Sequence, residues 1–311
     1  MSNKSKYLFG PVASRRLGLS LGVDIVPLKS CTQNCIYCQL GIDGIVTLER
    51  KPFVPIDDVI EELKVKITAG LEADYITLSG SGEPTLNSQL GLLIDKIRKI
   101  TKIPVAVITN GTLLGEPAVR ADCSKADVVL PSIDAGDRAT FEKINRPHKD
   151  IDFDAFVEGL CVFRAEFSGQ IWLEVFLLDG INSSENDATM FKEWIEKINP
   201  DKVHINTAVR PSAEIYARQV SSEKLLKFCS VLGEKAEIIV PYADSKKHER
   251  RINIEEELLD LLARRPCSLS DISSGLNVHK NEILKYIEHF VQSNKIVIKK
   301  KDHIIYYQTK S

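Results

Sequence analysis

Three cysteines stand close together near the start of the chain. Cys31, Cys35 and Cys38 form a C-x3-C-x2-C pattern, whereas the other four of the seven cysteines are isolated. Disulfide pairing is unusual in a reducing compartment, so the pattern predicts a metal site. Structural zinc is closed by four ligands, and iron–sulfur clusters are usually held by four cysteines. Three cysteines leave one iron open to bind and activate a small molecule; zinc with a distant fourth ligand is the alternative.

The elements that must position these cysteines alternate between strand and helix. Because the alternation is typical of parallel strands covered by helices, and six units are fewer than the eight of a closed barrel, we expect an open partial barrel or a doubly wound sheet. Ligands of both architectures gather at the carboxyl ends of the strands, where the cysteines lie. The expected strands are 19–25, 75–79, 104–109, 128–133, 171–178 and 202–206, and the expected helices are 56–69, 89–100, 138–144 with 153–167, 186–198 and 221–232.

Two motifs after the first two strands carry a family resemblance. CTQNCIYC at residues 31–38 and SGSGEP at residues 79–84 are similar to the cluster motif and the G-G-E-P motif of the radical S-adenosylmethionine (SAM) enzymes. The resemblance covers residues 7–210. It implies an α/β fold with a partial (βα)6 TIM-like barrel, a 4Fe-4S cluster, and SAM that is reductively cleaved to a 5'-deoxyadenosyl radical. Residues 9–41 more closely resemble a group related to the wyosine-forming tRNA enzymes, the 4-demethylwyosine synthases.

The resemblance also implies roles for individual residues. The three cysteines would bind three irons, with SAM on the fourth, while the main chain at residues 81–83 would receive the SAM amino group and Tyr37 would lie beside the adenine. Ser81 replaces a glycine of the family motif, so that contact requires Ser81 to have a negative φ. The implied metal ligands are Cys31, Cys35 and Cys38, and the implied SAM-binding residues are Tyr37, Ser81, Gly82, Glu83, Ser132 and Asp134.

Several further polar residues near strand ends have both an ordinary and a functional interpretation. The two asparagines among them match family positions but also suit simple turns. The arginines are either solvated or placed to bind a phosphate or carboxylate. Asp24 and Lys29, near the end of the first expected strand, are equally open to an ordinary or a functional interpretation. The residues are Asn110, Asn182, Arg15, Arg16, Arg210, Asp24 and Lys29.

The C-terminal part of the chain differs in character. We expect a radical SAM domain at 1–240, a charged linker at 241–253 and a winged helix-turn-helix domain at 254–311. In the last domain we expect helices at 254–263 and 278–291 and strands at 295–299 and 303–308. Ser268 and Asp271 are expected to form a capping pair, and Gly275 a turn. From residue 264 onward, nine lysines and arginines face four acidic residues. Such a domain contacts phosphates and base edges, or equally binds peptides or packs on another domain. The candidate contacts are His279, Lys280, Asn281, Lys285, Lys299, Lys300 and Lys301.

Composition sets the remaining expectations. The 41 lysines and arginines against 43 acidic residues give a net charge of −2, which argues against a wholly basic nucleic-acid coat protein. No apolar run approaches a membrane span and the start does not resemble a signal peptide, so we expect no membrane association and a cytoplasmic location. The leading hypothesis is a radical SAM enzyme that modifies RNA or, second, a peptide, with flavodoxin or ferredoxin as electron donor. The alternative is a non-catalytic regulator that binds zinc and DNA.

Overall fold

The computed structural model describes residues 6–41, 44–210, 212–239, 254–276, 278, 280–301 and 304–310. Six strand–helix units make up most of it, which confirms the expected α/β architecture. The strands are β2 (Gly18–Val23), β5 (Tyr75–Leu78), β6 (Val105–Ile108), β7 (Val128–Leu130) with β8 (Ser132–Ile133), β9 (Gln170–Leu177) and β10 (Lys202–Thr207). The helices that follow them are α1 (Ile56–Thr68), α2 (Leu90–Ile100), α3 (Pro117–Cys123), α4 (Arg138–Asn145) with α5 (Phe153–Glu166), α6 (Glu185–Ile198) and α7 (Ser222–Leu232).

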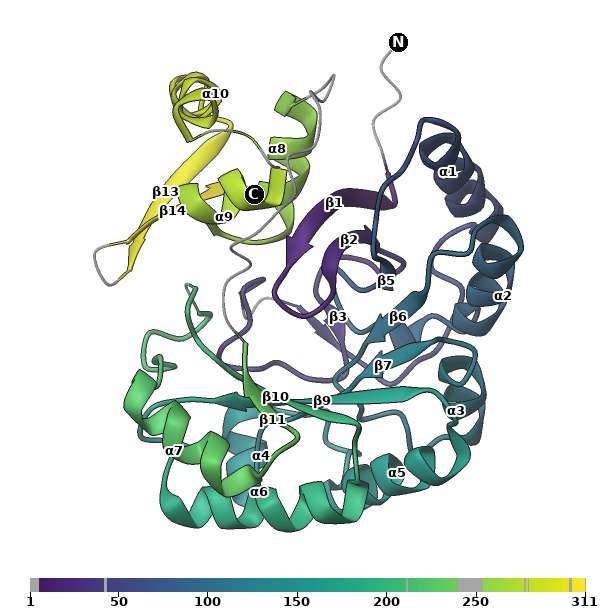
Figure 1. Ribbon diagram of the computed structural model, residues 1–311, viewed down its shortest axis with the longest axis vertical. Helices are drawn as coiled ribbons and strands as arrows, with labels where there is room; N and C mark the ends of the chain where they lie inside the picture. The colour runs from purple at the N-terminus through teal and green to yellow at the C-terminus, as the bar shows by residue number, and fades with distance from the viewer. Residues whose placement is uncertain are drawn as a thin grey trace.

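The strands form one curved, mostly parallel sheet. Its order is β1-β2-β5-β6-β7-β9-β10-β11, with β8 also paired to β9. The edge strands are β1 (Leu8–Ser14), which is antiparallel to β2, and β11 (Ala236–Ile238). The helices cover the outer, convex side of the sheet (Figure 1). This is the partial barrel of six strand–helix units, because the path through the described strands does not join β11 back to β1.

The apolar pattern of the sequence explains this layering. Seven of the eight residues of β9 are buried, as expected for a strand covered on both faces. In α2, Leu90, Leu93, Ile94 and Ile97 are buried, whereas basic residues occupy the last turn. The helix therefore presents one apolar stripe to the sheet. None of the helices in the described ranges is long and apolar enough to cross a membrane.

Local breaks separate some of the expected elements. The expected strand 128–133 is divided into β7 and β8 by Pro131, which has no amide hydrogen for a sheet hydrogen bond. The expected continuation from 138–144 into 153–167 is two helices, because Arg146 takes a left-handed conformation with φ 43° and Pro147 follows it. The sequence reasoning missed β1 and α3.

The C-terminal module, defined here as residues 254–310, has three helices and a three-stranded sheet. The elements are α8 (Ile254–Arg264), β12 (Cys267–Ser268), α9 (Leu269–Leu276), α10 (Lys280–Gln292), β13 (Ile296–Lys301) and β14 (Ile304–Thr309). Its classification as a winged helix remains a prediction. The Ser268–Asp271 capping pair is present, with each residue's backbone amide bonded to the other's side chain. Gly275 is buried within α9 instead of forming a turn.

The first strand of the C-terminal hairpin is longer than predicted. Lys300 and Lys301 lie between the expected strands at 295–299 and 303–308, but both belong to strand β13, which pairs with β14 up to Lys301. The predicted linker 241–253, His279 and the side chains of Asn281 and Lys285 lie outside the described residues.

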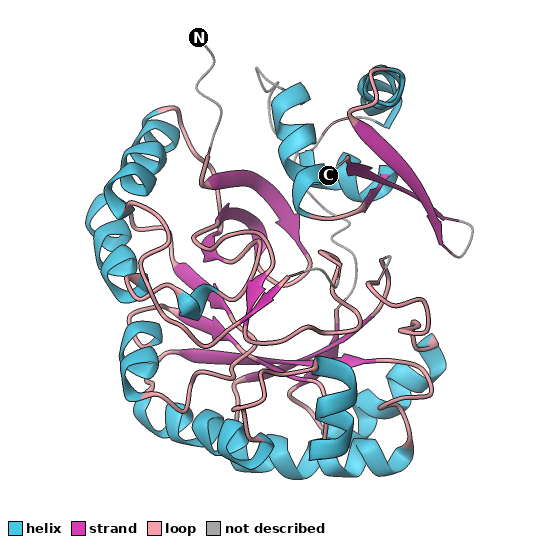
Figure 2. Ribbon diagram, turned by 180° about the vertical axis from the view of Figure 1, so that it is seen from behind, coloured by secondary structure: helices cyan, strands magenta, loops and turns pink. Residues whose placement is uncertain are grey.

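The C-terminal module packs directly against the barrel (Figures 1 and 2). Val12 of β1 is buried in the same apolar cluster as Leu258, Leu261 and Ile272 of the module. On the other side, the Lys301 Nζ donates to the backbone oxygens of Ala208 at 2.9 Å and Arg210 at 3.0 Å. The module therefore contacts both the first strand of the sheet and the loop after β10.

Candidate functional site

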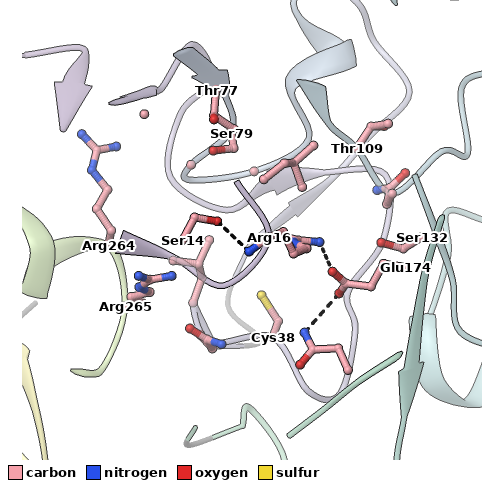
Figure 3. Close-up of a pocket in the computed structure, with 18 of the residues that line it drawn as sticks. Ser14, Arg16, Cys38, Thr77, Ser79, Thr109, Ser132, Glu174, Arg264 and Arg265 are labelled. Atoms are coloured by element: carbon pink, nitrogen blue, oxygen red, sulfur yellow. Dashed lines mark hydrogen bonds and ion pairs between the residues drawn. The ribbon is translucent and has the colours of Figure 1, made fainter. Parts of the chain in front are cut away.

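A pocket of about 400 Å³ lies inside the barrel, a volume within the usual range for ligand sites. Inward-facing residues of β2, β5, β6, β8, β9 and β10 line it, together with the loop after β2 and the end of α8. Figure 3 shows that polar and charged side chains from distant parts of the chain face one another across it. The site therefore belongs to both the barrel and the C-terminal module.

The three clustered cysteines lie on the wall of this pocket. Cys31 ends the short strand β3 (Ser30–Cys31), which pairs in parallel with β4 (Ile45–Val46). Two side-chain amides point at the sulfurs: Asn110 Nδ2 lies 3.5 Å from Cys31 Sγ, and Asn145 Nδ2 lies 3.5 Å from Cys35 Sγ. The loop is therefore supported from β6 and from the end of α4.

The glycine-rich loop after β5 contacts the cysteine loop backbone to backbone. The Glu83 amide donates to the Ser30 oxygen at 2.9 Å, and the Lys29 amide donates to the Ser81 oxygen at 2.5 Å. A Cβ atom on Gly82 would lie 2.0 Å from the Ser30 oxygen. Only glycine allows this approach, so Gly82 is required for the two loops to meet.

Ser81 fits the position where the related motif carries glycine. It is absent from the residues with positive φ, whereas its neighbour Gly80 has a φ of +149°. The Ser81 amide donates to Asp24 Oδ1 at 3.1 Å, and its hydroxyl donates to the same carboxylate. Ser81 therefore has the negative φ that is required where serine replaces the glycine of the family motif.

Glu83 is a buried anchor. It is 2% exposed and accepts hydrogen bonds from the side chain and amide of Thr85, the Thr109 hydroxyl and the Asn110 amide, at 2.6 to 3.0 Å. Burial raises the pKa of Glu83, and these hydrogen bonds oppose that rise. The carboxylate thus fixes the glycine-rich loop to the loop after β6.

Tyr37 is held from two sides. Its ring stacks on Phe176 with centroids 3.9 Å apart, and its hydroxyl donates to Asp134. Asp134 also accepts from Asn145 Nδ2 at 2.6 Å, and burial raises the pKa of Asp134 to about 6. Tyr37 and Ser132 line the pocket, with Asp134 fixing the tyrosine.

The chemistry of the cysteines suits a multi-iron cluster. Burial raises the pKa of Cys31 to about 12 and that of Cys35 well above its ordinary value, so their thiolates need bound cations. Among the described residues, no three His, Cys, Asp or Glu side chains are arranged around one metal ion. A cluster needs no such convergence because each cysteine binds a different iron. Three thiols spread along one wall therefore fit a 4Fe-4S cluster.

The structure brings most of the sequence-predicted residues together. Ser81 and Asp24 lie behind the glycine-rich loop, hydrogen bonded to each other, and fully buried Asn182 bonds to three backbone groups, as its ordinary interpretation expected. The predicted residues on the pocket wall are Arg15, Arg16, Lys29, Cys31, Cys35, Tyr37, Cys38, Gly82, Glu83, Asn110, Ser132 and Arg210.

Among the wall residues that sequence reasoning missed, five bear on the charge of the pocket and on the contribution of the C-terminal module. Glu174 and Asn206 are polar positions inside expected strands, which was the available signal. Leu261, Arg264 and Arg265 are far from the motifs in sequence. The only sequence signal at Arg264 and Arg265 was their positive charge at the end of an amphipathic helix, which does not predict that they reach the pocket.

Comparison with known proteins identifies the family. The model of the Radical SAM superfamily matches residues 25–192. A Brachyspira hyodysenteriae protein named GTPase Obg is 40% identical over 94% of this chain, which spans 44% of that relative's length. A UPF0026 protein of Methanocaldococcus jannaschii is 31% identical over 96% of this chain and 94% of its own length.

A solved structure of TYW1 with a lysine-pyruvate adduct bound shares the fold. It has a TM-score of 0.52 and 20% sequence identity, and the match covers 72% of this chain and 75% of that one. Radical SAM enzymes use a 4Fe-4S cluster and SAM, so this assignment also confirms the enzyme class and cofactors expected from the cysteine and glycine-rich motifs. The chain is therefore an enzyme of the radical SAM superfamily and, within it, belongs with the UPF0026 proteins.

Proposed function

We propose that Cys31, Cys35 and Cys38 hold the 4Fe-4S cluster and that Tyr37 and the loop at residues 79–84 hold SAM. The observation that carries this proposal is the backbone contact between the cysteine loop and the glycine-rich loop on the wall of one pocket. When bound by Cys31, Cys35 and Cys38, the cluster would supply the electron that cleaves SAM to methionine and a 5'-deoxyadenosyl radical, and that radical would take a hydrogen atom from the substrate.

The chain's own residues position the reactants and exclude water. Gly82 lets the two loops meet, and the stacked Tyr37 ring offers a fixed apolar surface for the adenine. Ser132, at the carboxyl end of the sheet, is available to contact SAM. The end of α8 covers the pocket beside β1, which limits access of water to a reactive radical.

The electron donor and substrate are further parts of the proposal. The other four cysteines are isolated in sequence, so we assign electron supply to an external protein such as flavodoxin or ferredoxin. We place RNA before a peptide as substrate because five arginines line the pocket. Lys301 bonds to barrel carbonyls, which leaves Lys299 and Lys300 as the exposed basic residues of its strand.

Anaerobic reconstitution tests this function. The full chain should contain about four irons and four sulfides, and with dithionite it should convert SAM to 5'-deoxyadenosine. Cys35→Ala should abolish both, whereas Cys161→Ala, outside the pocket wall on α5, should retain both. One zinc without sulfide would contradict the proposal and favour the regulator alternative.

A further inference from the structure

Five arginines line the pocket, and three of them each face a carboxylate. Arg16, in the turn between β1 and β2, pairs with Glu174 (Figure 3). The other two pairs join the barrel to the C-terminal module. They are Arg264 with Asp24, and Arg210 Nη2 with Asp271 Oδ1 at 3.4 Å.

The remaining two arginines have no such partner. Arg15 Nη1 donates to the amide oxygen of Asn206 at 3.1 Å, and the Arg265 guanidinium lies beside the Cys267 thiol. In the part of the chain that the structure describes, neither side chain is hydrogen bonded or ion-paired to a carboxylate. Lys29 and Glu83 also line this wall and offset each other, so five guanidinium groups against three paired carboxylates leave two positive charges in excess.

The environment of these groups shows the same excess of positive charge. Burial, followed by repulsion from Arg210 and Arg265, lowers the pKa of Arg15 to about 10. The pKa of Arg265 is lowered first by Arg210 and then by burial, and the Asp271 carboxylate opposes the lowering of the pKa at both Arg15 and Arg265. Arginines remain protonated at neutral pH despite such shifts, so the like charges persist and would be relieved by an anion.

An unused donor marks the same place. Arg210 is 7% exposed, and its Nε hydrogen is buried without a hydrogen-bond partner in the structure. A buried donor left unpaired is destabilising, because it has lost its hydrogen bonds to water. Arg210 lines the pocket among like charges, so this donor is placed to meet an oxygen of an anionic ligand.

We propose that Arg15, Arg210 and Arg265 bind a phosphate group of the substrate. A phosphate ester carries about −1.5 to −2 charges at neutral pH and several acceptor oxygens, which matches two uncompensated charges and an unused donor. A single carboxylate would supply only half that charge. The inference rests on the proposed function, since the phosphate-bearing molecule is the one presented to the radical chemistry in the same pocket.

The proposal gives the C-terminal module a direct role. Arg265 follows α8 directly, and α8 is held on β1 by the apolar cluster around Val12. The module therefore completes the substrate site, with one of the three phosphate-binding side chains. A remote tether for a macromolecule would require none of these contacts.

Calorimetric titration of the full chain with inorganic pyrophosphate tests the site. The unaltered chain should bind pyrophosphate, and Arg15→Gln and Arg265→Gln should each weaken binding at least about tenfold, because each removes a charge-assisted hydrogen bond. Arg265→Lys should recover most of the affinity. The double variant should lose less than the product of the two single losses, since both residues contact one anion.

Arg138→Gln is the matched control, because Arg138 is exposed and pairs with the surface aspartates Asp152 and Asp154. It should leave pyrophosphate affinity unchanged. A short single-stranded RNA with a 5'-phosphate distinguishes the source of the group: competition with pyrophosphate points to RNA, and failure to compete points to a small phosphorylated molecule.

Two results would overturn the proposal. One is the absence of pyrophosphate binding, or binding unaffected by Arg265→Gln in a variant with unchanged thermal unfolding. The other is loss of SAM affinity in the variants with pyrophosphate affinity intact, which would assign the arginines to the SAM carboxylate. Pyrophosphate binding that shows the expected variant losses in a chain unable to hold iron would support this site while refuting the proposed function.

Discussion

Replacing Gly82 with alanine should separate the two loops that build the site. The added Cβ would lie 2.0 Å from the Ser30 oxygen, whereas carbon and oxygen normally approach to about 3.3 Å. A shift of roughly 1.3 Å follows. It would break the hydrogen bond from the Glu83 amide to the Ser30 oxygen, now 2.9 Å long. It would also strain the hydrogen bond from the Lys29 amide to the Ser81 oxygen. Two weakened or lost buried hydrogen bonds predict a loss of about 2–4 kcal/mol in the free energy of unfolding.

The same displacement should affect SAM binding. The main chain proposed to receive the SAM amino group moves with Gly82, so we expect at least about a tenfold loss of affinity. Urea denaturation and calorimetric SAM titration of the reconstituted chain measure the two effects. Gly115→Ala is the control, since its Cβ would have its nearest neighbour at 4.0 Å. Equal stability and equal SAM affinity in the two variants would refute the argument.

Two further substitutions test the supports of the pocket. Glu174→Gln leaves the largely buried Arg16 guanidinium without a counter-charge and should lower the free energy of unfolding by about 2–4 kcal/mol. Glu61→Gln, in an exposed pair with Lys64, should cost less than about 1 kcal/mol, and similar losses for the two variants in urea denaturation would contradict this. Tyr37→Phe keeps the stacking but removes the donor to Asp134, so stability should fall by about 1–2 kcal/mol, and an unchanged unfolding midpoint would count against that hydrogen bond.

The sequence predicted the parts of the fold that depend on local patterns. Apolar runs followed by amphipathic stretches located the strands of all six units and the helices of five of them. It missed β1, because Gly10 and Pro11 interrupt its pattern; an edge strand tolerates proline, whereas a central one does not. It missed α3 because a helix of seven residues that begins with Pro117 shows too few turns for periodicity.

The candidate site likewise contains residues that local sequence patterns predict and residues that only tertiary packing brings in. Cysteine spacing and the glycine-rich motif are local signals, and both located residues on the pocket wall. Arg264 and Arg265 reach that wall because the C-terminal module packs on the barrel, in part through the apolar cluster that Val12 and Leu261 share. That contact joins residues about 250 positions apart, and no periodicity or spacing within the C-terminal segment specifies which face of the barrel it covers.

Low-temperature electron paramagnetic resonance of the reduced, reconstituted chain tests the central claim most directly. If Cys31, Cys35 and Cys38 hold a 4Fe-4S cluster with one open iron, the reduced protein should give a cluster signal that changes when SAM is added. The Cys35→Ala chain should give no such signal. A wild-type signal that SAM leaves unchanged would contradict SAM binding at the cluster, and the absence of any cluster signal from the wild-type chain would contradict the ligand assignment itself.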